Sequence, residues 1–321
     1  MAFTRRTFLG GLAAVSAAAQ PPRPPRIKTW KPKLEVLGRY IESNLEFLKA
    51  EGFAGVELTT SPKGILDFGT ASDEVLERVK STVRRLGLDL SVIQSVQNHV
   101  APDPEARQRA NTVFARTIEA AGKLGAKFVS TTSGTIPGKP LEEQVGEIVR
   151  VYTEKYFPLC EKHKVRILWE PWAAGPNVAT GPVGYEALFK AFGNSPHVGI
   201  QYDPSHLAWQ MMDPIQAMRD FMGQIHAVHL KDVEIRWDVV RKAGINPLNR
   251  AEWWRFRLPG MGVIDWPAFF TVLMEAGYDG PMSIEHEDRF YGFPFPGDEF
   301  PEDYKTGLRV ALRYLRQFVP A

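Results

Sequence analysis

The sequence is poor in cysteine, in net charge and in long apolar runs, and each lack excludes a class of protein. Cys160 is the single cysteine among 321 residues, so no intramolecular disulfide can form. The net charge of +2 is too small to indicate a nucleic-acid partner or an anionic membrane surface. The apolar stretch near the N-terminus is too short for a membrane-spanning helix, and no cysteine follows it to carry a lipid. We therefore expect no stable membrane anchor.

The first 19 residues have the pattern of a twin-arginine export signal. TRRTFL (4–9) supplies the basic pair, and GGLAAVSAAA (10–19) supplies a mildly apolar stretch of small residues. Ala17–Ala19 fits a cleavage site just before Gln20. A disordered basic N-terminus is the alternative. We expect the twin-arginine export machinery as a partner and a periplasmic or otherwise extracytoplasmic location.

Beyond this signal, strand-like and helix-like segments alternate along the chain. Residues 20–26, QPPRPPR, form a Pro-rich spacer, so one folded domain is expected over 27–321. Strands are predicted at 33–37, 55–58, 88–94, 127–131, 165–170, 198–203, 225–232 and 281–287. Helices are predicted at 43–50, 73–86, 104–124, 141–162, 184–192, 214–222, 266–276 and 302–317. Eight such units predict an α/β fold, a single-domain closed (β/α)₈ TIM barrel. A doubly wound sheet is the alternative, but no G-x-G-x-x-G follows the first strand.

Side chains of the kind that bind metals follow four late strands. The segments ILWEP, IQYDPSH, VHLKD and SIEHED contribute Glu170, Asp203, His229 and Glu285. The carboxyl ends of parallel strands meet at one end of a barrel, where barrel enzymes build their active sites. Three carboxylates and one imidazole suit one divalent cation: Mn²⁺, Mg²⁺, Co²⁺ or Zn²⁺. The alternatives are a salt bridge from Glu170 to an arginine and a turn that begins at Asp203.

Further residues near the strand ends are candidate substrate contacts: His206, Lys231, Trp172, Glu57, His99 and Arg257. His206 can approach either the metal or a substrate oxygen, and Lys231 can bind an oxyanion or a neighbouring carboxylate. Glu57 and His99 end or follow early strands, and each can face the pocket or pack elsewhere.

A long connection, 233–265, interrupts the alternation. It is rich in tryptophan and arginine, which argues against disorder, so we expect it to pack over the barrel mouth and to bring Arg257 there. The aromatic loop 289–300, which follows the last strand, is expected to cover the same face.

The order of these motifs resembles the xylose isomerase-like barrels, the sugar phosphate isomerase/epimerase family, over residues 27–320. That family includes tagatose and psicose 3-epimerases, hydroxypyruvate isomerase and inosose dehydratase. The resemblance implies that the four strand-end residues named above hold one divalent metal ion, usually Mn²⁺. It also implies that Glu170 and Glu285 form a proton-transfer pair and that His206 contacts the substrate.

Two departures set this chain apart from the 3-epimerases of that family. Pro176 stands where those enzymes have a second glutamate, and Ile235 and Arg236 stand where they have an arginine after the metal histidine. The His-x-Lys-Asp run at 229–232 is closer to the inosose dehydratase branch, in which Lys231 would assist elimination.

These features predict an exported, metal-dependent sugar isomerase or epimerase that acts on a keto-sugar or related polyol through an enediolate. A lyase is the alternative, either a 3-keto-glycoside eliminase or an inosose dehydratase-like enzyme, because the same enediolate can expel a β leaving group. An endonuclease IV-like repair enzyme would need more zinc ligands and a basic groove. A non-catalytic carbohydrate-binding barrel is a further alternative, and the oligomeric state is open, with a homo-oligomer as one option.

Overall fold

The structure, a computed structural model, describes residues 30–60 and 66–319. The predicted signal peptide (1–19) and spacer (20–26) lie outside the described residues, as do the first residues of the expected domain. Within the two described ranges, no helix has both the length and the apolar composition that crossing a bilayer requires.

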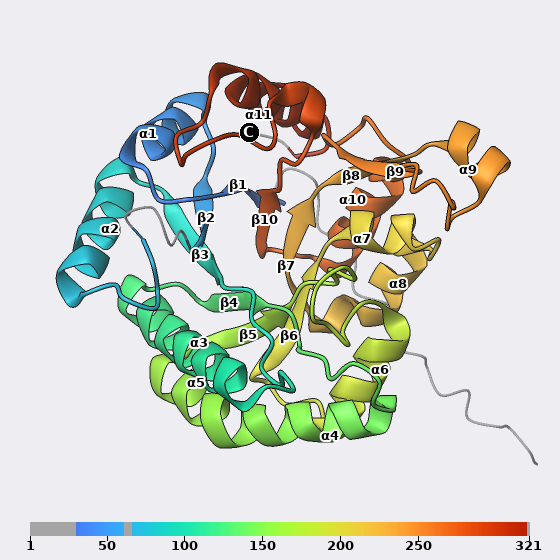
Figure 1. Cartoon of the computed structure of the whole chain (residues 1–321). Helices are drawn as coiled ribbons and strands as arrows, with labels where there is room; N and C mark the ends of the chain where they lie inside the picture. Colours follow the sequence, from blue (N-terminus) through green and yellow to red (C-terminus); the bar gives the residue numbers. More distant parts are fainter. Residues whose placement is uncertain (1–29, 61–65, 320–321) are drawn as a thin grey trace, which may run out of the picture.

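Eight parallel strands form a closed barrel at the centre of the molecule (Figure 1). The strands are β1 (Lys33–Gly38), β2 (Gly55–Thr59), β3 (Asp89–Gln94), β4 (Phe128–Thr131), β5 (Arg166–Trp169), β6 (Val198–Tyr202), β7 (Ile225–Leu230) and β10 (Pro281–Ile284). Their order around the barrel is β1, β10, β7, β6, β5, β4, β3, β2, and β2 pairs again with β1. The predicted (β/α)₈ barrel is therefore confirmed, because a doubly wound sheet would be open.

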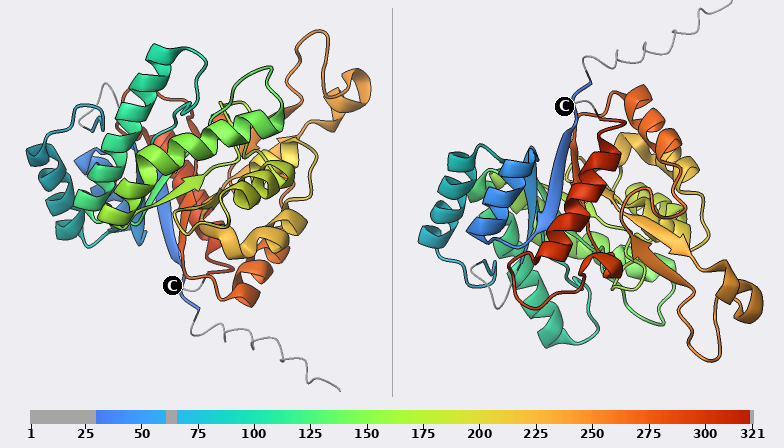
Figure 2. Two further views of the ribbon diagram at one scale, coloured as in Figure 1. Left: turned by 90° about the horizontal axis from the view of Figure 1, so that it is seen from below. Right: turned by 90° about the horizontal axis from the view of Figure 1, so that it is seen from above.

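Helices surround the barrel (Figure 2). They are α1 (Glu42–Glu51), α2 (Asp73–Leu86), α3 (Pro104–Leu124), α4 (Leu141–Val151), α5 (Phe157–His163), α6 (Pro182–Ala191), α8 (Pro214–Phe221), α10 (Trp266–Ala276) and α11 (Glu302–Leu315). The helix predicted at 141–162 is a continuous run of α4, a π-helical turn η1 (Tyr152–Tyr156) and α5. Pro158 accounts for the irregular turn, because its nitrogen has no hydrogen to donate to the preceding turn.

Side chains along each strand alternate between the inside and the outside of the barrel. The inward-facing side chains form an apolar level and, further along the strands, a polar level. The apolar level is a small cluster with Phe128 packed against it: Val92, Leu168 and Ala227. Two positions further along the same three strands are polar or ionisable side chains, all buried: Gln94, Glu170 and His229. The interior therefore becomes polar toward the carboxyl ends of the strands, the end at which the sequence predicted a site.

The long connection after β7 is a folded arm rather than an irregular loop. β8 (Asp232–Ile235) and β9 (Trp254–Arg257) form an antiparallel pair, with α9 (Trp237–Ala243) between them. We call residues 232–257 the β8–β9 arm. Figures 1 and 2 show α9 projecting beyond the outline of the barrel. The expectation that the whole connection covers the mouth is thus wrong for α9, because the hairpin carries it outward.

Asp232 holds the base of this arm in place through hydrogen bonds. Its buried carboxylate accepts hydrogen bonds from the backbone N–H groups of Val233, Gly260 and Ile264 at 2.8, 3.0 and 3.1 Å, and from Trp266 Nε1 at 2.8 Å. A Cβ atom on Gly262 would lie 2.2 Å from Asp232 Oδ1, so only glycine fits there. Asp232 therefore holds the returning chain, 258–266, against β8.

Candidate active site and metal centre

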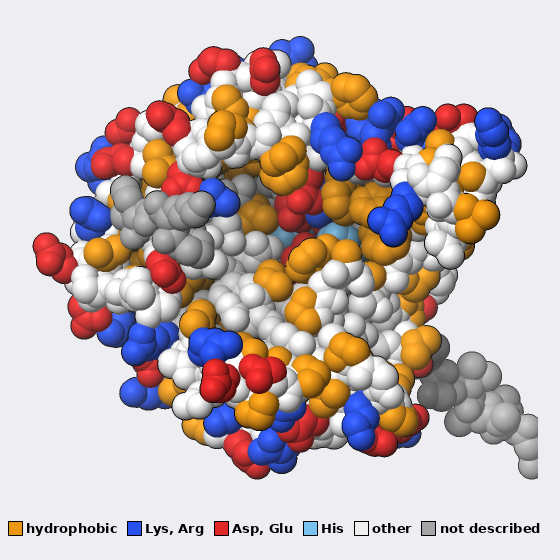
Figure 3. Space-filling view, viewed as in Figure 1, with side chains coloured by type: hydrophobic (Ala, Val, Ile, Leu, Met, Phe, Trp, Pro, Cys, Tyr) orange, Lys and Arg blue, Asp and Glu red, His pale blue; other side chains and the backbone are white. Residues whose placement is uncertain are grey.

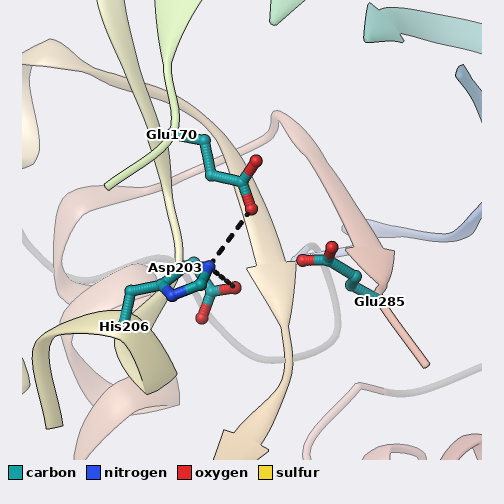
Figure 4. Close-up of side chains that lie close together, drawn as sticks. All are labelled: Glu170, Asp203, His206 and Glu285. Carbon is teal, nitrogen blue, oxygen red and sulfur yellow. Dashed lines mark ion pairs between the residues drawn. The ribbon is translucent and has the colours of Figure 1, made fainter. Parts of the chain in front are cut away.

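Four ionisable side chains converge inside the mouth of the barrel (Figure 4). Glu170 follows β5, Asp203 follows β6, His206 lies in the short helix α7 (Pro204–Trp209), and Glu285 follows β10. Each offers one oxygen or nitrogen atom, and these four atoms all lie within 4.8 Å of one another. Figure 4 shows the side chains pointing into one common space from three sides. This arrangement is suited to a cation.

Local chain geometry explains why two of these side chains point inward. The backbone N–H of Glu170 still donates to Thr131 O at 3.0 Å, and Pro171 then ends the strand ladder. Asp203 caps α7, where its Oδ1 accepts hydrogen bonds from the N–H and hydroxyl of Ser205 at 2.8 and 2.6 Å. The turn predicted at Asp203 is therefore confirmed through Oδ1, while metal binding through Oδ2 stays a prediction.

The second oxygen of Asp203 is the clearest sign of a cation site. Asp203 Oδ2 is buried and accepts no hydrogen bond from any described residue, although Lys231 Nζ lies 3.2 Å away and His206 Nε2 lies 3.7 Å away. The Lys231 ammonium forms an ion pair with Oδ2 but not in a hydrogen-bond direction, and His206 Nε2 is too far away for a hydrogen bond. The ion pair with Lys231 offsets part of the cost of burying this oxygen, and its open hydrogen-bond position is one that a metal cation could fill.

His229 lies at the floor of the same cluster. Its Nδ1 is 2.8 Å from Glu285 Oε2, 3.2 Å from Glu170 Oε1 and 3.9 Å from Asp203 Oδ2. On its other side, Nε2 lies 3.2 Å from Glu57 Oε2. Burial lowers the pKa of His229, but the surrounding carboxylates outweigh burial and hold that pKa well above its usual value. Two imidazoles, those of His206 and His229, therefore lie close to the carboxylates of this cluster.

Lys231 places an ammonium among the carboxylates. Its Nζ lies 2.7 Å from Glu285 Oε2, 3.0 Å from Glu287 Oε2 and 3.4 Å from His206 Nε2, and the side chain is 1% exposed. Burial lowers the pKa of Lys231, but Asp203, Glu285 and Glu287 raise it well above its ordinary value. The ammonium is therefore charged, and it contributes part of the positive charge that these carboxylates need.

The two glutamates of the predicted proton-transfer pair sit in different electrostatic environments. Burial raises the pKa of Glu170, but His229, His206 and Lys231 together hold it well below its usual value. Burial, with the nearby charges of Glu170 and Glu287, raises the pKa of Glu285 to about 7, although Lys231 and His229 oppose the rise. Such separation of two carboxyl groups is typical of acid/base pairs.

Two predicted substrate contacts occupy structural positions instead. Both ring nitrogens of His99 are engaged, with Tyr156 Oη at 3.0 Å and Thr131 Oγ1 at 3.1 Å. Its ring packs edge-on against Phe114 of α3 and Tyr152 of η1, and burial lowers its pKa to about 3. Glu57 is fully buried below His229. Both side chains thus have protein partners, and substrate contacts by His99 and Glu57 stay predictions.

Trp172 and Arg257 lie nearer the rim. Trp172 is half-buried, and its ring packs so closely on Gly175 that a Cβ atom there would lie 2.3 Å away. Arg257 Nε donates to Asp288 at 2.8 Å and its Nη1 donates to Glu234 at 2.8 Å. The guanidinium is thus paired with two carboxylates, and substrate contacts by Trp172 and Arg257 remain predictions.

The structure adds residues to the site that were not predicted. Gln94 Nε2 donates to Glu170 at 3.2 Å, and Gln201 Nε2 donates to both oxygens of Glu57 at 2.8 and 2.9 Å. Strand alternation would have found Gln201, which lies two residues before Asp203. No pattern in the sequence indicates the third added residue, Phe256, because the antiparallel arm brings its ring to 4.2 Å from Lys231 Nζ.

The mouth above the cluster is hollowed. Figure 3 shows recessed red and pale-blue side chains at the centre of this face, with orange apolar side chains around them. Beside Glu285 and Glu287 lies a cavity of 250 Å³, lined in part by Phe293 and Phe295. The loop 289–300 therefore covers this side of the mouth, as predicted.

Comparison with known proteins places this barrel in a family. The sequence pattern of the family described as "Xylose isomerase-like TIM barrel" matches residues 45–317, which is most of the chain. The chain belongs to this family. The family match and the closed barrel agree with the resemblance found in the sequence.

Individual relatives differ in how much of the chain they match. The uncharacterized protein YfiH of Bacillus subtilis (strain 168) is 29% identical over 315 residues, covering 87% of this chain and 95% of that protein. An inosose dehydratase of Clostridium tetani (strain Massachusetts / E88) is 37% identical over 93 residues, covering 28% of this chain and 30% of that protein. The apo structure of the 3-keto-D-glucoside 4-epimerase YcjR from E. coli matches with a TM-score of 0.66 at 17% identity. That match covers 89% of this chain and 100% of the other, and it shows the fold alone.

Proposed function

We propose that this protein is a divalent-metal-dependent sugar isomerase or epimerase that acts on an uncharged keto-sugar or related polyol through an enediolate. One observation carries the proposal: Glu170, Asp203 and Glu285 meet two imidazoles inside the barrel mouth, and Asp203 Oδ2 faces them without a hydrogen bond. Similarity to epimerases and isomerases of the same fold supports it.

The residues present fit a divalent cation. Glu170, Asp203 and Glu285 supply oxygen ligands, and His206 or His229 supplies nitrogen, a mixed set that suits Mn²⁺ and leaves Mg²⁺, Co²⁺ and Zn²⁺ as alternatives. When bound, such a cation would polarise a substrate carbonyl and stabilise the negative charge of the enediolate. Glu57 would orient His229 from below, since it lies 3.2 Å from Nε2.

Proton transfer would be the task of the two glutamates. Glu170 and Glu285 extend from β5 and β10, which β6 and β7 separate in the barrel wall, so their carboxylates approach the common space from different directions (Figure 4). A substrate held between them presents one face of its α-carbon to each. One glutamate can then remove the α-proton while the other returns a proton to the opposite face, which inverts the centre.

The charge of the site favours an uncharged substrate over a sugar phosphate. Lys231 and His229 lie among a group of buried or partly buried carboxylates: Glu57, Glu170, Asp203, Glu285 and Glu287. Even with a divalent cation in place, the carboxylates outnumber the positive charges, and an added phosphate would be repelled. The predicted export signal supports the same choice, since free and glycosidic sugars are available outside the cytoplasm.

Elimination on the same scaffold is the second candidate, and Lys231 is the observation that favours it. The ammonium contacts Glu285 at 2.7 Å and lies 3.2 Å from Asp203 Oδ2, so it borders the space in which an enediolate would form. From there it could give a proton to a leaving group β to the carbonyl. The partial similarity to inosose dehydratases supports this alternative.

Hydrogen exchange at the α-carbon tests the proposal. The Mn²⁺-loaded protein is incubated in D₂O with a panel of keto-sugars and 3-keto-glycosides, and products are read by NMR. We expect deuterium at the α-carbon of at least one substrate, and loss of exchange in Glu170→Gln and in Glu285→Gln, because each removes one proton carrier. Glu275→Gln is the control, since Glu275 pairs on the surface with Arg219 at 2.6 Å.

Three outcomes separate the candidates. An epimerised product supports the leading function, and an unsaturated product supports the lyase. Binding of sugars without any exchange would instead indicate a non-catalytic carbohydrate-binding barrel. Exchange at the wild-type rate in both glutamine variants would refute the assignment of Glu170 and Glu285 as the proton-transfer pair.

A further inference from the structure

A series of aromatic side chains leads outward from the candidate metal centre. Lys231 Nζ lies 4.2 Å from the centroid of the Phe256 ring, and the His206 ring meets Phe256 edge-on at 5.3 Å. Phe256 in turn meets Trp254 at 4.9 Å. Trp254 stacks on Trp209 of α7 with ring centroids 4.8 Å apart and planes 11° apart. These contacts connect the Lys231 ammonium to the tryptophan pair through Phe256.

The pair is part of the rim of the mouth and not of the closed core. Trp209, Trp254 and Phe256 are each half-buried. They come from two elements that meet only because the β8–β9 arm folds back toward α7. Figure 3 shows apolar side chains on this face between the recessed acidic and histidine side chains and a group of Lys and Arg side chains at the upper right. The aromatic surface is thus continuous with the candidate active site.

The charged neighbours of this surface are paired with each other. Arg255 donates to Glu234 through Nε at 2.7 Å and Nη2 at 2.9 Å. Arg257 donates to Asp288 and Glu234, each at 2.8 Å. Because these guanidinium groups already hold carboxylates, the rim is not arranged to bind a phosphate. Beside the site, the arm and α7 thus present half-buried aromatic rings that pack against the core, with paired charges around them.

A pyranose ring fits such a surface, because one of its faces carries C–H groups while its edge carries hydroxyls. An indole ring can stack on the C–H face, while the hydroxyls stay in water or reach polar neighbours. We infer that the substrate is a glycoside with two rings, whose reacting keto-sugar ring binds at Glu170 and Glu285 and whose second ring stacks on the Trp254–Trp209 pair. This inference rests on the proposed function and adds the substrate class to it.

A matched pair of probes isolates the second ring. The 3-keto derivative of cellobiose and methyl 3-keto-β-glucoside share the reacting ring, but only the first has a second sugar ring. Dissociation constants and kcat/KM are measured for both with the Mn²⁺-loaded full chain. We expect the two-ring probe to bind roughly tenfold more tightly, which corresponds to one aromatic stacking contact. The 3-keto derivatives of maltose and sucrose extend the test to other linkages.

Substitutions in the β8–β9 arm test whether Trp254 causes the preference for the two-ring probe. Trp254→Ala should abolish the two-ring preference and leave the affinity for methyl 3-keto-β-glucoside unchanged. Trp254→Phe keeps a flat ring and should retain most of the preference, which separates stacking from a loss of folding. Trp237→Ala is the matched control, because Trp237 lies on α9 of the same arm and is 48% exposed. That variant should behave like the wild type.

The binding and turnover measurements distinguish a failure of this inference from a failure of the proposed function. A two-ring preference that disappears in Trp254→Ala supports the inference even if no probe is turned over, in which case the proposed function fails alone. Turnover of both probes with equal affinity, unchanged in Trp254→Ala, supports the function and overturns the inference. The inference is also overturned if none of the three disaccharide derivatives binds more tightly than the methyl glycoside.

Discussion

At the scale of single residues, the site depends on charges that compensate each other in a buried space. Asp203 Oδ2 and Glu285 face Lys231 Nζ at 3.2 and 2.7 Å, and His229 lies against Glu285 at 2.8 Å. The residue types and their places at the strand ends could be read from the sequence. The pairing of particular atoms could not, because the sequence left open whether Lys231 binds an oxyanion or a neighbouring carboxylate, and the structure shows it against Glu285 and Glu287.

Replacing Lys231 tests this compensation. Lys231→Met leaves the carboxylates without their ammonium, and we expect the metal-free protein to lose about 3–5 kcal/mol of its free energy of unfolding. Adding Mn²⁺ should restore more stability to this variant than to the wild type, because the cation replaces the missing charge. Differential scanning calorimetry with and without Mn²⁺ measures both effects.

A surface lysine provides the control for that experiment. Lys139 pairs with Glu143 at 2.9 Å, and both side chains are more than half exposed. Lys139→Met should change the melting temperature little, with or without Mn²⁺. An equal Mn²⁺-induced rise in Lys231→Met and in the wild type would contradict the compensating role of Lys231.

At the scale of elements, alternation of strands and helices predicted the eight β/α units but not α7 or the β8–β9 arm. The arm was read as a loop because its two strands are separated by 18 residues, 236–253, and no short turn motif joins them. α7 is a six-residue helix after Asp203-Pro204, too short for a periodic pattern. Both elements adjoin the site, so sequence patterns predicted the scaffold better than its rim.

Asp232 is predicted to hold the arm to the barrel. Asp232→Ala leaves the N–H groups of Gly260 and Ile264 and the indole of Trp266 without their acceptor, and we expect a loss of about 2–4 kcal/mol in the free energy of unfolding. Asp232→Asn should lose less, because one oxygen remains. Urea unfolding measures both variants.

Hydrogen exchange locates the effect of Asp232→Ala. The amides of Gly260 and Ile264 should lose protection first, while amides of β1 keep theirs. Uniform loss of protection across the barrel would mean that Asp232 supports the whole fold and not the arm.

At the scale of the whole molecule, barrel closure brings the ligands together. Glu170, Asp203 and Glu285 are separated by 33 and 82 residues in the sequence, yet parallel strands with side chains alternating in and out place all three at one end of one interior. This convergence could be predicted once eight units were counted. The choice between His206 and His229 as nitrogen ligand could not, because it depends on side-chain depth.

The binding of Mn²⁺ to Asp203→Asn tests the central claim, that this cluster is a metal centre, most directly. Asp213→Asn is a close control, because Asp213 also caps a helix that begins with proline and accepts hydrogen bonds through Oδ1 from Ile215 and Gln216. Isothermal titration should give one Mn²⁺ per chain in the wild type and in Asp213→Asn, and at least roughly tenfold weaker binding in Asp203→Asn. Equal affinity in all three proteins, or no stoichiometric binding in the wild type, would contradict the account.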